Sequence, residues 1–420
     1  MVIFAISYKE IFPKRIYSVI YHMKTSGSHS TGKCSRAIRI SPIIYFLISI
    51  GVSLQISGSN WDIVWHGVGN VETFFTPPHS VIYSGVALAI GSIIGGIIQA
   101  AFTIRQQKKD VTWFVLFPSS LPLSLKLATI GCILQLTAGP FDFLWHTQFG
   151  FDGLLSPPHS VLAVGMLTTA LGALIGIYSH CSNHSSRKIN NTSSPSFFSK
   201  LSLLVGFAVF LMVAVGMILM FTLPFSKGQY FDFNPYPLAA LVAASVSIPF
   251  ILGNCLFVAA RISYLSTNNR IPFILTSIIA VIMTIQSTTT ITSNSYFAWL
   301  FPFYLLNIIP AMVADILIFR SSKKKKASSK IDNTIDNRAK KWYLIASVII
   351  SVFYITLFFP WTIDVFGGYF EPPNTLRTEQ FFVQLLFPTI LPFMVSVSKV
   401  SSLLGGLVAQ LLINSRKLLV

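Results

Sequence analysis

W-D-I-V-W-H at residues 61–66, followed by E-T-F-F-T-P-P-H-S at residues 72–80, is a stretch of sequence that this chain contains twice. The second copy reads F-D-F-L-W-H at residues 141–146 and D-G-L-L-S-P-P-H-S at residues 152–160, about 80 residues later. Both copies keep the pattern D-x3-H-x12-H, and together they hold four of the eight histidines. Aspartate and histidine are side chains that bind transition metals. The duplication therefore predicts either two metal sites or one site built from both copies.

Each copy lies between two long apolar runs, and the composition of the whole chain is that of a membrane protein. Mean hydropathy is +0.68, 53% of the residues are hydrophobic and only 10% are charged, against about a quarter in soluble domains. An apolar run of roughly 18 or more residues is long enough to cross the hydrocarbon core of a bilayer. We expect an all-α fold, a polytopic transmembrane helical bundle of about ten spans. The expected spans cover residues 41–57, 79–103, 119–138, 159–179, 200–223, 237–260, 272–291, 296–319, 343–360 and 380–413.

The positive charges alternate along the chain and predict its topology. Lysine and arginine gather in the N-terminal segment, in the loops at 104–109, 187–200, 261–270 and 320–341, and at the C-terminus. The intervening loops contain almost none. Under the positive-inside rule both termini are cytoplasmic, and both histidine motifs lie on the extracytoplasmic side of the cell membrane. The net charge of +17 is then a topology signal, and the expected partner is the lipid bilayer and no nucleic acid.

The expected spans and the motifs divide the chain into six parts, in which one helical hairpin occurs twice in the same orientation. The parts are a basic cytoplasmic segment at 1–40, a first hairpin with its motif at 41–103, a second hairpin with its motif at 119–183, spans five to eight at 200–319, a basic cytoplasmic loop at 320–342, and the last two spans at 343–420.

The spacing within each motif predicts how its polar side chains meet. Asp62 and His66 are four residues apart, so a helix places them on one face. Proline is tolerated in the first turn of a helix, so Pro-Pro-His predicts that His79 begins the following span. Closure of the hairpin then brings His79 beside the other two, and three ligands leave coordination positions open. The second copy repeats this arrangement with Asp142, His146 and His159.

Four more residues belong to the predicted sites. Glu72 and Asp152 hold equivalent loop positions, where each is an acceptor for a ligand imidazole or a further ligand. Trp65 and Trp145 suit the membrane interface. A set of two histidines and one carboxylate is compatible with copper, zinc, iron or manganese, and the spacing does not choose among them. The alternative without metal is that each Asp–His pair is hydrogen-bonded and caps its helix.

The first copy resembles the metal-binding segment of the C subunit of particulate methane and ammonia monooxygenases, D-x3-H-x4-R-D-T-x-F-T-P-S-H. The ligand spacing matches fully, and T-x-F-T-P-x-H matches from Thr73 to His79. The resemblance implies copper at Asp62, His66 and His79, oxygen-dependent oxidation of C–H or N–H bonds, and further membrane subunits as partners. The arginine of the family is Val71 here, its next aspartate is Glu72, and the stretch after Asp152 departs from T-x-F-T.

Three functions stay open on the sequence. The first is an oxygen-using copper subunit, which needs an electron donor from a partner because no haem, flavin or cupredoxin signature is visible. The second is a membrane protein that acquires or transports copper without catalysis, which predicts methionines near the mouth of the site. The nine methionines do not cluster in the outer loops. The third is a metal-free structural scaffold.

Overall fold

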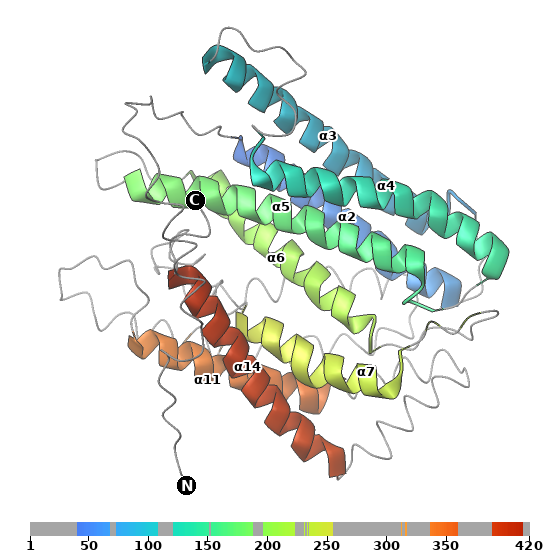
Figure 1. The fold of residues 1–420 in the computed structure, drawn as a ribbon, viewed down its shortest axis with the longest axis vertical. Helices are drawn as coiled ribbons and strands as arrows, with labels where there is room; N and C mark the ends of the chain where they lie inside the picture. The colour runs from blue at the N-terminus through green and yellow to red at the C-terminus, as the bar shows by residue number, and fades with distance from the viewer. Residues whose placement is uncertain are drawn as a thin grey trace, which may run out of the picture. The chain divides into compact units, whose positions relative to one another are not determined.

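The computed structural model describes most of the chain between residues 40 and 414, and all of the regular structure in the described part is helical (Figure 1). The described residues are 40–67, 73–107, 121–150, 153–187, 196–222, 231, 233, 235–254, 312, 316, 337–359 and 389–414. The helices are α2 (Pro42–Gly67), α3 (Pro77–Gln107), α4 (Leu123–Phe149), α5 (Pro157–Arg187), α6 (Phe197–Leu219), α7 (Pro237–Val242), α11 (Asn337–Phe353) and α14 (Leu391–Asn414). The π-helical turns η3 (Ala243–Ser247) and η5 (Tyr354–Phe358) continue α7 and α11.

Six of these helices are long and apolar enough to cross a membrane, which confirms the all-α, multi-pass prediction. The candidate spans are Pro42–Ile63, Pro77–Gln106, Leu123–Phe149, Pro157–Cys181, Phe197–Leu219 and Leu391–Ala409. Two shorter apolar helices cover Leu238–Asn254 and Leu344–Leu357. The spans expected at 272–291 and 296–319 lie outside the described residues, apart from Met312 and Ile316. The count of ten spans and the side of the membrane on which each end lies stay predictions.

Proline residues predict where α3 and α5 begin, whereas hydropathy does not predict where α2 ends. α3 and α5 begin at the Pro-Pro pairs Pro77-Pro78 and Pro157-Pro158, as predicted. The expected first span ends at residue 57, whereas α2 continues to Gly67. Hydropathy detects the stretch that suits hydrocarbon, but the backbone stays helical through the polar residues that follow it.

Each of the first two hairpins closes on a pair of glycines. A Cβ on Gly51 would lie 2.6 Å from the carbonyl oxygen of Gly85, and a Cβ on Gly131 would lie 2.5 Å from that of Gly165. The backbones of α2 and α3, and of α4 and α5, therefore approach more closely than side chains would allow. The two crossings use equivalent positions of the two sequence copies.

The two hairpins and α6 share one apolar core. α6 packs on both α2 and α5, and its Phe207 is 1% exposed within this core. The hydroxyls of Tyr45 and Ser124, 2.7 Å apart, join α2 to α4. A second cluster lies between α7, η5 and α14 and includes Leu154, which precedes α5. The large exposed apolar side chains of α3 and α4 are those that lipid would cover, among them Ile94, Ile98, Phe102, Ile130 and Ile133.

Candidate metal centre

The first motif brings its three polar side chains together where α2 ends and α3 begins. His66 Nε2 lies 3.4 Å from Asp62 Oδ2, one helical turn away in α2. His79 Nε2, from the first turn of α3, lies 3.3 Å from Asp62 Oδ1. Thr76 fixes the start of α3, since its Oγ1 accepts a 3.4 Å hydrogen bond from the backbone N–H of His79. We call Asp62, His66 and His79 the first triad.

The second motif repeats this arrangement between α4 and α5. Asp142 Oδ1 lies 3.5 Å from His146 Nε2 and 3.2 Å from His159 Nε2. The two Nε2 atoms lie 3.4 Å from each other. All three side chains are mostly buried, and the His146 side chain is only 4% exposed. We call Asp142, His146 and His159 the second triad.

Backbone carbonyl groups orient three of the four imidazoles. His79 Nδ1 lies 3.2 Å from the carbonyl oxygen of Thr73, His159 Nδ1 lies 3.2 Å from that of Gly153, and His146 Nδ1 lies 3.1 Å from that of Gly150. A carbonyl oxygen can only accept, so each Nδ1 carries the hydrogen and donates it. In a neutral imidazole the Nε2 atom then carries a lone pair and no hydrogen. Where both imidazoles of the second triad are neutral, two such lone pairs and a carboxylate oxygen face one another.

The arrangement of each triad also suits a metal ion. Asp62 Oδ1 and Asp142 Oδ1 are buried, and each lies within 3.5 Å of an imidazole nitrogen. The ligand atoms of each triad all lie within 4.8 Å of one another. Metal–ligand bonds of about 2.0–2.1 Å in tetrahedral geometry separate the ligand atoms by roughly 3.3 Å, close to the spacing seen in both triads. Each triad can therefore hold a metal ion.

Two glycines give the second triad its backbone geometry. Gly150, which ends α4, has φ 66° and ψ −160°, and Gly153 has φ 106°. Residues with a side chain rarely adopt such conformations, and glycine adopts them without steric cost. The carbonyl groups of these two glycines are those that orient His146 and His159. Gly153 replaces Thr73 of the first copy, and the backbone contact to histidine is the same in both.

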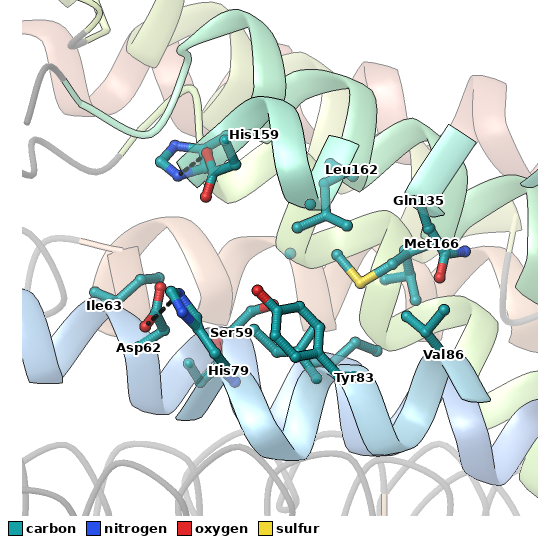
Figure 2. Close-up of a pocket in the computed structure, with 18 of the residues that line it drawn as sticks. Ser59, Asp62, Ile63, His79, Tyr83, Val86, Gln135, His159, Leu162 and Met166 are labelled. Carbon is teal, nitrogen blue, oxygen red and sulfur yellow. Dashed lines mark ion pairs between the residues drawn. The ribbon is translucent and has the colours of Figure 1, made fainter. Parts of the chain in front are cut away.

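The two triads lie next to each other and open into one cavity. The rings of His66 and His146 have centroids 6.1 Å apart and are tilted by 41°. A cavity of about 410 Å³ is lined by residues of both triads and by α3, α4, α5 and α6. Figure 2 shows Asp62 and His79 on one side of it and His159 on the other. The structure thus joins the two predicted sites at one cavity.

The walls of this cavity were not predicted from the sequence. Outside the triads they are mostly apolar, with Ser59, Asn60, Tyr83 and Gln135 as polar exceptions. Tyr83 lies one helical turn after His79, and the two rings have centroids 5.9 Å apart. Gln135 occupies the position in α4 that Gln55 occupies in α2. A polar residue repeated inside two apolar runs is the feature of the sequence that could have indicated Gln135 as a cavity residue. Four of the nine methionines also line the cavity: Met166, Met212, Met217 and Met220.

The remaining predicted residues are only partly described. Trp145 stands in a cluster of rings, with centroid distances of 5.7 Å to Phe141, 4.7 Å to Phe149 and 6.1 Å to Phe231. Trp65 is half-buried on α2. Glu72 and Asp152 lie outside the described residues, so their contact with the triads stays a prediction.

The described part of the chain therefore combines six candidate membrane spans with two Asp/His/His groups that could hold metal ions. Comparison of the chain with protein-family models, with curated proteins and with solved structures finds no match.

Proposed function

We propose that this chain is an integral membrane protein that binds copper at both triads and serves as a subunit for oxygen-dependent oxidation, similar to the C subunit of particulate methane and ammonia monooxygenases. The observation that carries the proposal is the second triad, where Asp142 Oδ1 and the Nε2 atoms of His146 and His159 converge within 3.5 Å of one another. In neutral imidazoles with the hydrogen on Nδ1, both Nε2 atoms offer a lone pair, and one cation among the three atoms could bind them all.

The residues around the triads would prepare the site for this chemistry. The carbonyl groups at Thr73, Gly150 and Gly153 hold the imidazoles in one orientation, which a metal site needs before binding. Three ligands per ion leave a position open, and bound copper would supply the reaction with oxygen there. The cavity beside the triads has mostly apolar walls, which would favour an apolar molecule over water. An electron donor and further membrane subunits belong to this proposal as partners.

The proposal includes the topology expected from the sequence. About ten spans, with both termini in the cytoplasm, would set the triads at the extracytoplasmic side of the cell membrane. The six-part division, with its duplicated hairpin, is supported by the equivalent crossings at Gly51–Gly85 and Gly131–Gly165. An outward site would take its copper from outside the cytoplasm.

A second function, copper acquisition or transport without catalysis, is favoured by one observation. Four methionines line the cavity: Met166 of α5, Met212 and Met217 of α6, and Met220, which directly follows α6. Thioether sulfur is a soft ligand that selects Cu(I). The sequence suggested no such methionine cluster, because these residues lie within spans and not in the outer loops.

Oxygen uptake by the copper-loaded protein in lipid nanodiscs separates the two functions. With ascorbate as the electron source, we expect uptake to rise when n-octane is added, and to return to the background rate in a variant in which His66, His79, His146 and His159 are all replaced by alanine. Unchanged uptake, together with accumulation of copper inside sealed vesicles that contain the protein, would favour transport. Unchanged uptake without accumulation would reject both.

A further inference from the structure

The cavity carries a hydrogen-bond acceptor at the end away from the triads. We propose that it binds an aliphatic molecule with a terminal hydrogen-bond donor, an alcohol or amine of roughly eight to ten carbons. The donor group would bond to Gln135 Oε1, and the chain would run along the cavity towards the triads. This inference rests on the proposed function, because it names the class of molecule that the proposed site would bind.

Gln135 has a fixed amide orientation that leaves its oxygen without a partner. The side chain is buried, with the residue 2% exposed, and lines the cavity. Its Nε2 donates a 2.8 Å hydrogen bond to Thr169 Oγ1, which in turn donates its own hydrogen to the carbonyl oxygen of Gly165 at 2.9 Å. Because the Thr169 hydrogen is already used, the amide nitrogen and not the oxygen must face Thr169. Gln135 Oε1 then has no hydrogen-bond partner.

A buried acceptor of this kind requires a hydrogen-bond donor, either an ordered water or a ligand. The neighbouring walls are apolar and hold water poorly, because an ordered water needs two to four polar partners. Figure 2 shows Gln135 and Met166 at one end of the cavity, with Leu162 and Tyr83 between them and the triads. A ligand that satisfies Gln135 Oε1 must therefore be apolar over the rest of its length.

The distance along the cavity sets the length of this ligand. A volume of about 410 Å³ is far above the roughly 10–15 Å³ that a single water needs, so the cavity has room for a molecule of many atoms. Gln135 and Asp142 are seven residues apart in α4, so the helical rise separates them by about 10 Å along the helix axis. A molecule bonded at Gln135 therefore needs a chain of about this length to bring its far end beside the triads.

The cavity wall includes a side chain that the helices leave partly uncovered. Leu136 lines the cavity, and 53% of its surface is exposed on α4. We infer that an aliphatic molecule enters beside Leu136 from the membrane, where such molecules concentrate.

The chain offers a matched control for Gln135. Gln55 holds the equivalent position in α2 and is fully buried, but it is not among the residues that line the cavity. Gln135→Met and Gln55→Met both remove an amide and keep an unbranched side chain of similar length. Only the first removes the acceptor from the cavity.

The experiment is photo-labelling of the protein in lipid nanodiscs with an octanol analogue that carries a diazirine at its far end. The labelled peptides are found by mass spectrometry, and n-octanol competes against its methyl ether at equal mole fraction in the lipid. The ether keeps the chain and the oxygen but has no hydrogen to donate. We expect label in the segments that hold the triads, and competition by octanol about tenfold stronger than by the ether. We expect Gln135→Met to abolish this preference and Gln55→Met to keep it.

Equal competition by octanol and ether in the wild-type protein would overturn the inference, as would an equal loss of preference in both variants. Absence of label from the cavity would overturn it as well. The labelling is done on metal-free and on copper-loaded protein. If the protein binds no copper but still prefers octanol to the ether, the proposed function is rejected and the proposed ligand pocket is supported. Protein that binds copper without the preference would reject only the pocket.

Discussion

At the scale of single residues, backbone carbonyl groups orient the rings of three of the four histidines of the triads. The carbonyl groups of Thr73 and Gly153 make the same contact to His79 and His159, although the residues differ. A carbonyl group is present whatever the side chain, so the second copy can depart from T-x-F-T without losing the orientation of its histidine. The departure in sequence therefore does not argue against a second metal site.

Replacement of Gly150 tests this role of the backbone. Gly150→Ala puts a side chain at φ 66° and ψ −160°, which costs about 1–3 kcal/mol or shifts the backbone. The carbonyl group that orients His146 then moves. We expect copper binding at the second triad to weaken about 10- to 100-fold, as measured by titration against a chelator of known affinity.

Gly91→Ala is the control for this variant, since a Cβ there meets nothing within 4 Å. The first triad is an internal control, because Gly150 makes no part of it. Unchanged copper affinity in Gly150→Ala would show that the orientation of His146 does not depend on this carbonyl group.

The charge of the carboxylate is the second residue-scale test. Asp62→Asn keeps the shape of the side chain and replaces one carboxylate oxygen by an amide nitrogen, which cannot bind a cation. We expect affinity at the first triad to fall at least about tenfold, with affinity at the second triad unchanged, in the same titration. Equal weakening at both triads would mean that the two sites hold their metal as one unit.

The residues of the triads could be predicted from spacing, whereas the cavity could not. Asp62 and His66 share a helix face by periodicity alone, and the Pro-Pro pair sets the start of α3. Tyr83 and Met166 face the cavity because of how α3 and α5 rotate against their neighbours, which spacing does not encode. Gln135 could have been noticed, since a glutamine recurs at the same position of both apolar runs.

At the scale of helices, the two glycine crossings determine how closely each hairpin closes. Gly85→Ala would bring a Cβ to 2.9 Å from the Gln55 backbone nitrogen and still closer to the Gly51 carbonyl oxygen. Backbone atoms cannot give way cheaply, so α2 and α3 must separate. We expect a loss of about 1–3 kcal/mol of stability and a lower midpoint of thermal unfolding.

Gly91→Ala, in the same helix α3, is the control for this test as well. It meets open space, and alanine favours helix over glycine by up to about 1 kcal/mol, so its midpoint should equal or exceed that of the wild type. Copper affinity at the first triad should fall only in Gly85→Ala, because separation of the helices moves His79 from Asp62. Equal midpoints for the two variants would contradict the crossing at Gly85.

The ends of the helices show which part of an element can be read from the sequence. Proline fixes the first turn through its missing N–H, so the starts of α3 and α5 were predicted to within two residues. The end of α2 was not, because hydropathy reports suitability for hydrocarbon while helix hydrogen bonds continue through Asp62 and His66. The polar extension is the part of α2 that carries the first triad.

At the scale of the whole molecule, the fold class followed from composition, since 53% hydrophobic residues in long runs suit only a membrane protein. The contact of α6 with both hairpins could not be predicted, because an apolar helix in a bundle has no polar face to show which side meets lipid. The joining of two distant motifs at one cavity depends on that packing.

The predicted topology can be tested by cysteine labelling in intact cells. In a background where all four cysteines are replaced, Asn70→Cys should react with a membrane-impermeant maleimide before lysis, and Ser194→Cys only after lysis. The reason is the alternation of basic loops, which keeps the loop at 187–200 in the cytoplasm. The reverse pattern of labelling would place both triads on the cytoplasmic side and remove the argument for copper from outside.

The metal content of the purified protein tests the central claim most directly. The measurement is mass spectrometry of metals after copper loading, on the wild type, on His66→Ala/His79→Ala and on His146→Ala/His159→Ala. We predict about two copper ions per chain in the wild type and about one in each double variant, because each variant leaves one triad complete. A wild-type protein that takes up no metal on titration, or variants that keep the full wild-type content, would contradict the account.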